Sequence, residues 1–92
     1  MHAVLVNVTI APGQFDAARK VLNDQVVPRI KQMHGLVKGY WTVRDDTQQG
    51  TSMAVFQTKQ DADAAMSTIR SSQPPPGVTI NSIEVREIVA EA

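Results

Sequence analysis

The order in which hydrophobic periodicities follow one another restricts the fold of this chain more than any other feature. An apolar pattern with a period of two residues, which is typical of strands, marks His2–Ile10, Leu36–Arg44, Thr51–Gln57 and Val78 to about Val89. Apolar residues spaced by three and four, which is typical of helices, mark the stretches from Gln14 to Gly35 and from Lys59 to Ser72. The order is therefore strand, helix, strand, strand, helix, strand.

Local signals at the helix ends agree with this division. Thr58, with Asp61 three residues later, fits a capping box at the start of the second helix. Pro28 lies inside the first helical stretch, and we expect it to kink that helix or to split it after Val27, because an interior proline removes a backbone hydrogen bond. The βαββαβ order predicts an α+β, ferredoxin-like domain with two helices on one face of a four-stranded antiparallel sheet.

Length and charge narrow the possible partners. The 92 residues suffice for one domain, which we place at 1–92. Nine basic and nine acidic residues give no net charge, so no nucleic-acid or acidic-membrane partner is expected. Cysteine is absent, which excludes disulfides and thiolate chemistry, and no apolar run is long enough to cross a membrane. A globular protein of the cytoplasm is the expectation.

The sheet face that the helices leave uncovered is expected to bind another protein surface. Two helices cover only one face, and the expected helix-facing set of the first strand is Val4, Val6, Val8 and Ile10. The other strands carry apolar residues on both faces, so an apolar patch would stay exposed. We expect a homodimer that packs sheet against sheet and closes a barrel of about eight strands, with room for side chains or one small ligand. The alternative is a monomer with a partly apolar surface.

Several stretches resemble a known group of proteins. The order of elements, the stretch Met33–Val37, the strand residues Gly39–Trp41 and the passage Phe56–Lys59 are similar to those of dimeric α/β-barrel proteins, and most like small antibiotic-biosynthesis-monooxygenase-like domains. This resemblance implies a dimeric α/β barrel. It also implies one of several functions: cofactor-independent oxygenation of polycyclic aromatic substrates, haem degradation, isomerase-like or dehydratase-like chemistry, or a stress-associated role. Many proteins of this group have no assigned activity.

The resemblance also points to particular residues. Relatives that oxygenate haem or aromatic substrates place an asparagine on the first strand, facing the barrel cavity, and Asn7 matches that position. They use a tryptophan near the end of the third strand, where this chain has Phe56 and Gln57. The haem-degrading relatives add a histidine on the second helix, which here contains none. Haem degradation is therefore not expected.

Two residues are candidates for catalysis. The amide of Asn7 could hold a substrate oxygen or an oxyanion, or it could simply bond to a neighbouring side chain. His34 is the candidate general base, because histidine alone titrates near neutral pH when unperturbed. Its position at a helix end also suits a structural role.

The candidate substrate-binding residues are Asn7, Thr9, Tyr40, Trp41 and Thr42. Tyr40 and Trp41 are neighbours on a strand, so one faces the helices and the other the barrel; alternation alone leaves open which is which. Either ring could form a wall for a flat aromatic ligand.

The remaining acidic residues of the sequence do not indicate a metal site. Asp45 and Asp46 are expected to lie on a solvated turn, and no cluster has the spacing of a metal site. No cofactor is expected. Two hypotheses remain open: a cofactor-independent monooxygenase-like enzyme acting on a small hydrophobic or aromatic substrate, and a non-catalytic ligand-binding or structural dimer of the same fold.

Overall fold

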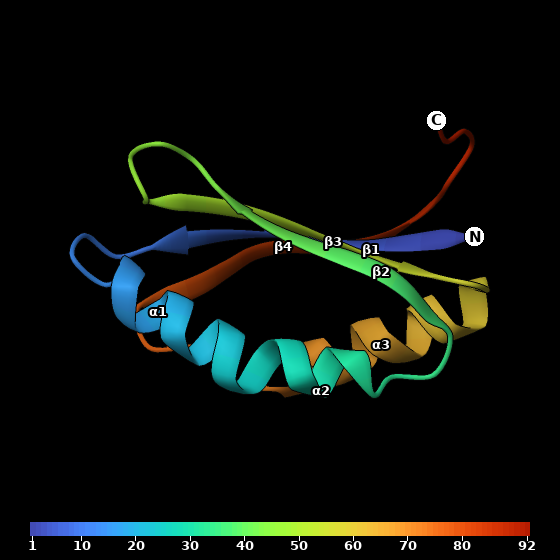
Figure 1. Cartoon of the computed structure of the whole chain (residues 1–92), viewed down its shortest axis with the longest axis horizontal. Helices are drawn as coiled ribbons and strands as arrows, with labels where there is room; N and C mark the ends of the chain where they lie inside the picture. Colours follow the sequence, from blue (N-terminus) through green and yellow to red (C-terminus); the bar gives the residue numbers. More distant parts are fainter.

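The computed structural model describes all 92 residues and has two layers, a sheet and a layer of helices (Figure 1). The strands are β1 (His2–Ile10), β2 (Leu36–Val43), β3 (Gln49–Phe56) and β4 (Val78–Glu87). They pair in the order β2-β3-β1-β4, and every pair is antiparallel. The helical elements are α1 (Phe15–Val21), the π-helical turn η1 (Leu22–Val26), α2 (Val27–Lys31) and α3 (Lys59–Ser71). The ferredoxin-like α+β fold predicted from the sequence is confirmed.

The hydrophobic core lies between the sheet and α3. Val4 of β1 pairs with Ala54 of β3 and with Val85 of β4, so these three side chains face the helices together. Phe56 and Val4 are almost completely buried, and Ala62 and Ala65 of α3 pack against them. Because alanine side chains are small, they let the helix backbone lie close to the sheet.

The first helical stretch runs without a break from Phe15 to Lys31, although it contains Pro28. Instead of splitting the helix, the chain forms the π-helical turn η1 just before the proline, with the Val27 N–H donating to the Leu22 carbonyl. In a regular α-helix Pro28 would leave the carbonyl of residue 24 without a donor and its ring would collide with that group. The wider turn relieves this conflict, so the expected split after Val27 is replaced by a π-turn that ends there. We call this whole stretch, α1 with η1 and α2, the long helix.

Several boundaries differ by one or two residues from the sequence-based ones. Strand β3 begins at Gln49 instead of Thr51, because Gly50 pairs with Val8 on one side and with Val43 on the other. Strand β4 ends at Glu87, and the last residues form a tail that rises away from the helices (Figure 1). The cap at α3 is as predicted: the Thr58 hydroxyl accepts a hydrogen bond from the Asp61 N–H at 3.1 Å. None of the helices has the length and apolar composition needed to cross a bilayer.

Candidate functional site

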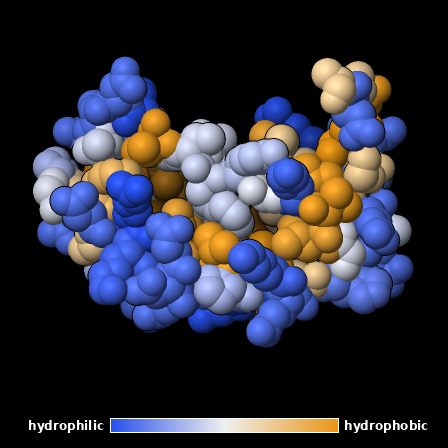
Figure 2. All heavy atoms as spheres, in the orientation of Figure 1, coloured by the Kyte–Doolittle hydropathy of each residue, from blue (hydrophilic) through white to orange (hydrophobic).

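A pocket of about 750 Å³ lies between the long helix and the sheet. Its floor is the helix-facing side of β1, including Val6 and Val8, and its roof is the apolar stripe of the long helix, including Ala18 and Val26. In Figure 2 apolar residues reach the surface between the two layers, whereas the outer side of the long helix is polar. A cavity of this size accommodates a small organic molecule.

Small residues keep this space open. Gly39, Gly50 and Ala54 line the sheet side of the pocket, and Ala18 lines the helix side. A Cβ atom on Gly39 would lie 3.1 Å from the ring of Trp41, so the glycine leaves room for the indole. A Cβ atom on Gly50 would lie 3.2 Å from Val8 and 3.0 Å from the Thr42 carbonyl oxygen. Larger residues at these positions would push into the strands or into the pocket.

The structure decides which aromatic residue of β2 faces the helices. Trp41 pairs with Ser52, which in turn pairs with Val6, so the indole lies on the helix-facing side and forms part of the pocket wall. Tyr40 lies on the opposite side, 53% exposed, with the Lys38 Nζ 5.9 Å from the centre of its ring. Trp41 therefore belongs to the pocket.

The other predicted residues gather on the free face of the sheet, away from the helices. Asn7 donates from Nδ2 to the Ser82 hydroxyl at 3.0 Å and accepts at Oδ1 from the Thr51 hydroxyl at 2.8 Å. The Thr42 hydroxyl donates to the Thr51 carbonyl at 2.6 Å. These four residues, Thr42, Thr51, Asn7 and Ser82, cross all four strands in one line, which we call the polar row.

A bulge in β4 extends this polar surface. The pairing of β1 with β4 shifts between Asn7 and Val8, and Asn81 is the extra residue. Its Nδ2 donates to the Thr9 hydroxyl at 2.7 Å. The predicted residues are thus divided by the direction of their side chains: Asn7, Thr9, Tyr40 and Thr42 face away from the helices, and Trp41 faces them. Tyr40 and Thr42 nevertheless belong to the pocket lining, because β2 forms part of its sheet side. The roles assigned to these residues stay predictions.

His34 lies outside the pocket, where the long helix turns into β2. Its Nδ1 donates to Asp61 Oδ1 at 2.9 Å, which links the end of one helix to the start of α3. This hydrogen bond, together with the cap at Thr58, lowers the pKa of the Asp61 carboxyl below its ordinary value. The imidazole itself is almost fully exposed. The group that His34 contacts is the Asp61 carboxylate of α3. A role for His34 as a general base is still a prediction.

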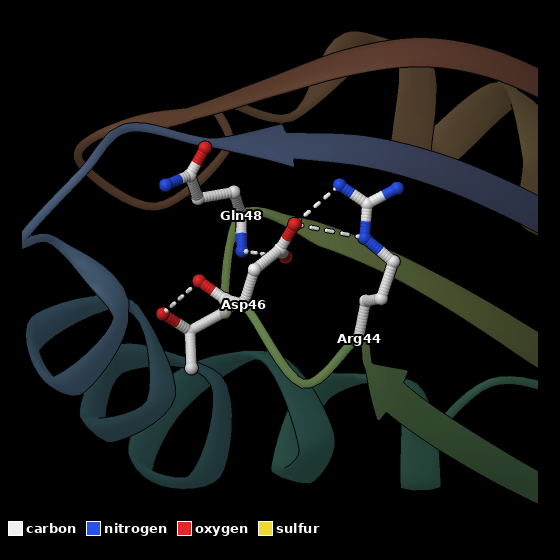
Figure 3. A network of polar contacts seen from close by, with 4 residues as sticks. Arg44, Asp46 and Gln48 are labelled. Atoms are coloured by element: carbon white, nitrogen blue, oxygen red, sulfur yellow. Dashed lines mark hydrogen bonds and ion pairs between the residues drawn. The ribbon is translucent and has the colours of Figure 1, made fainter.

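The acidic pair at Asp45 and Asp46 forms part of the hairpin between β2 and β3, as expected. Asp46 accepts from the Arg44 guanidinium and, at 2.9 Å, from the Gln48 N–H (Figure 3). The Arg44 side chain is the main reason why the pKa of Asp46 is lowered. The carboxylate therefore shapes the turn. Nowhere do three histidine, aspartate or glutamate side chains converge as they would around a metal ion.

The two charged residues of the pocket, Arg19 and Arg29, were not among the residues predicted from the sequence. The lining contains no aspartate, glutamate, histidine or lysine. Both arginines follow or precede a buried residue of the apolar stripe, Ala18 and Ile30. Their position beside the apolar stripe was the only sequence signal that could have placed them at the pocket. Arginines in such positions are usually only in contact with solvent.

No protein-family model and no functionally curated protein matches the sequence. Solved structures do match. HapK from Hahella chejuensis has a TM-score of 0.75 and 9% identity over 100% of this chain and 96% of its own. A dimeric ferredoxin-like protein from an uncultured marine organism has a TM-score of 0.67 and 11% identity over 99% and 97%. The chain has the ferredoxin-like fold of these proteins.

A third match has a bound ligand. A monooxygenase from Streptomyces coelicolor, solved in complex with nanaomycin D, has a TM-score of 0.59 and 10% identity over 99% of this chain and 92% of its own. At such identities the likeness extends to the fold alone.

Proposed function

We propose that this protein binds a small, largely aromatic molecule in the pocket under the long helix and oxygenates it without a cofactor. The pocket carries the proposal. It has the volume of a small organic ligand, an apolar floor and the indole of Trp41 in its wall. The structural likeness to a monooxygenase that binds nanaomycin D supports the same class of reaction.

The reaction needs few protein groups, because the substrate supplies the electrons. In an anthrone-like substrate, loss of a proton gives an enolate that reacts with dioxygen. The CH₂ group becomes a carbonyl, one oxygen atom is retained there, and the other leaves as water. The pocket would exclude water from the enolate, and the arginines at its wall would stabilise the negative charge.

A non-catalytic binding protein is the second candidate, and one observation favours it. The pocket lining has no histidine, aspartate, glutamate or lysine that could take the proton from the substrate. In this case the ligand would be held in the same place and released unchanged.

Oxygen uptake separates the two candidates. The purified protein, treated with chelator, would be tested with hydroquinones and anthrones, and binding would be followed by the fluorescence of Trp41, the only tryptophan of the chain. Uptake above the uncatalysed rate supports the oxygenase, whereas a fluorescence change without uptake supports the binding protein. If neither signal appears across the panel, both candidates are refuted.

The Asn7→Ala variant locates the reaction. Asn7 lies on the free face and not in the pocket lining. Uptake that persists in the variant places the reaction under the long helix. Uptake that disappears while Trp41 still responds would instead place it on the free face, where Asn7 was predicted to act.

We further propose that the functional unit is a homodimer joined through the free faces of two sheets. Tyr40 and Met53 are exposed there, and Met53 pairs with Tyr40 of β2 on one side and with Leu5 of β1 on the other. In Figure 2 the surface above the sheet dips between two raised ends, which in Figure 1 are the β2–β3 hairpin and the C-terminal tail. The dimeric ferredoxin-like relative in structure supports a homodimer.

Light scattering tests the dimer. The wild-type chain should elute with about twice its mass of 10.0 kDa. The Met53→Lys variant should shift toward the monomer, because it would bury a charge without a partner. Gln60→Lys, which adds the same charge on the exposed side of α3, is the control and should remain dimeric. A wild-type monomer at micromolar concentration would contradict the proposal.

A further inference from the structure

The charged residues that line the pocket are all positive. Arg19 and Arg29 are its only charged lining residues. Both belong to the long helix, Arg19 to the last turn of α1 and Arg29 to α2, and both are exposed at its side. An apolar cavity with a positive wall favours the binding of anionic ligands over neutral ligands of the same shape.

Neither arginine is neutralised within the protein. The ion pairs of the structure use other basic residues: Lys20, His34, Arg44, Lys59 and Arg86. Asp24, which lies between the two arginines in the sequence, accepts from Lys20 Nζ at 2.9 Å. The guanidinium groups therefore keep their hydrogen-bonding capacity for a ligand, and guanidinium remains charged at any pH at which the protein is folded.

We propose that the pocket selects aromatic acids: molecules whose ring system lies against Trp41 and the valines of the floor, and whose carboxylate, sulfonate or ionised phenol meets Arg19 or Arg29. This inference rests on the proposed function, since it specifies the ligand of the same pocket. It also gives the arginines a part in the chemistry. A positive wall favours the ionised form of a phenol or an enol, which is the form that reacts with dioxygen.

Two probes with nearly the same aromatic frame test the inference. 8-Anilinonaphthalene-1-sulfonate carries a negative charge, and N-phenyl-1-naphthylamine does not. Their dissociation constants would be measured at low salt through the quenching of Trp41, so that only binding near the pocket is counted. We expect the sulfonate to bind about three- to tenfold more tightly than the neutral probe, as charge-assisted hydrogen bonds at a partly exposed site allow.

Substitutions of the arginines give the decisive comparison. In the double variant Arg19→Gln with Arg29→Gln, the preference for the sulfonate should fall to about one, while the neutral probe binds as before. Lys31→Gln is the matched control, because Lys31 lies on the same helix, has no ion pair and does not line the pocket. It removes the same charge and should keep the preference.

Each other outcome has a definite meaning. An unchanged preference in the double variant, or an equal loss in Lys31→Gln, would overturn the inference. If wild-type protein binds neither probe, the proposed pocket function fails instead. If the double variant no longer binds the neutral probe, the two single variants are compared in its place, and each should lose part of the preference.

Discussion

The space under the long helix can be filled from the helix side by one substitution. Ala18 lines the pocket and is 6% exposed, so the additional atoms of Ala18→Leu would project into the cavity and not into solvent. We expect this variant to be more stable than the wild type and to bind the aromatic probes more weakly. Both effects follow from the same cause, because the new side chain occupies volume that the ligand would otherwise use.

The magnitude follows from the buried carbon atoms. Leucine adds three carbon groups to alanine, and about 0.8 kcal/mol for each gives roughly 2.4 kcal/mol. Holding the leucine in one rotamer costs about 0.5 to 1 kcal/mol, which leaves a net gain of about 1.5 kcal/mol. For a domain of this size that gain raises the melting temperature by roughly 6 to 12 °C.

Urea unfolding and Trp41 quenching would be measured on the same samples. Ala17→Leu is the control, because it makes the same chemical change one position earlier on the exposed side of α1. It should leave stability and probe binding close to wild type. A destabilised Ala18→Leu variant that still binds the probes as tightly as wild type would refute the reasoning, since the cavity would then not lie where Ala18 points.

Three further predictions concern the contact between His34 and Asp61, the turn at Gly35 and the free face of the sheet. Because the His34 hydrogen bond lowers the pKa of Asp61 below 3.8, its stabilising effect is present above that value and is lost as the pH falls through the lowered pKa. The unfolding free energy of Asp61→Asn should therefore depend less on pH below about pH 4 than that of wild type, as measured by urea titration. Gly35→Ala should cost about 1 to 2 kcal/mol or more, because φ is +80° and a Cβ atom would collide with the Asp61 carboxylate; an unchanged melting curve would contradict this. Asn7→Ala should lose about 1 kcal/mol in urea unfolding, because it removes two hydrogen bonds of the polar row.

Most of the fold could be predicted because each strand and helix repeats its pattern over several residues. The alternation from Val4 to Ile10 placed β1 and its helix-facing side correctly. Pro28 was harder, since its conflict with the helix can be relieved by a break or by a wider turn, and only packing decides between them. The early start of β3 at Gln49 depends on pairing with two other strands, which a local pattern does not contain.

The pocket was less predictable than the fold. Its walls come from both layers and from residues far apart in the sequence, and most of them are ordinary apolar residues without a motif. Alternation placed Tyr40 and Trp41 on opposite faces but gave no reference for which face the helices cover. Arg19 and Arg29 look like solvated helix residues until the roof and floor of the cavity are known.

The long helix is fastened to the sheet by fewer buried side chains than its length suggests. Ala18 and Ile30 are its only buried residues, whereas the shorter α3 contributes Ala62 and Ala65 directly to the core around Phe56. We therefore expect local opening of the long helix to require less free energy than opening of α3, and its amide protons to exchange with solvent earlier. An opening confined to the long helix would expose the pocket while the core beneath α3 stays closed.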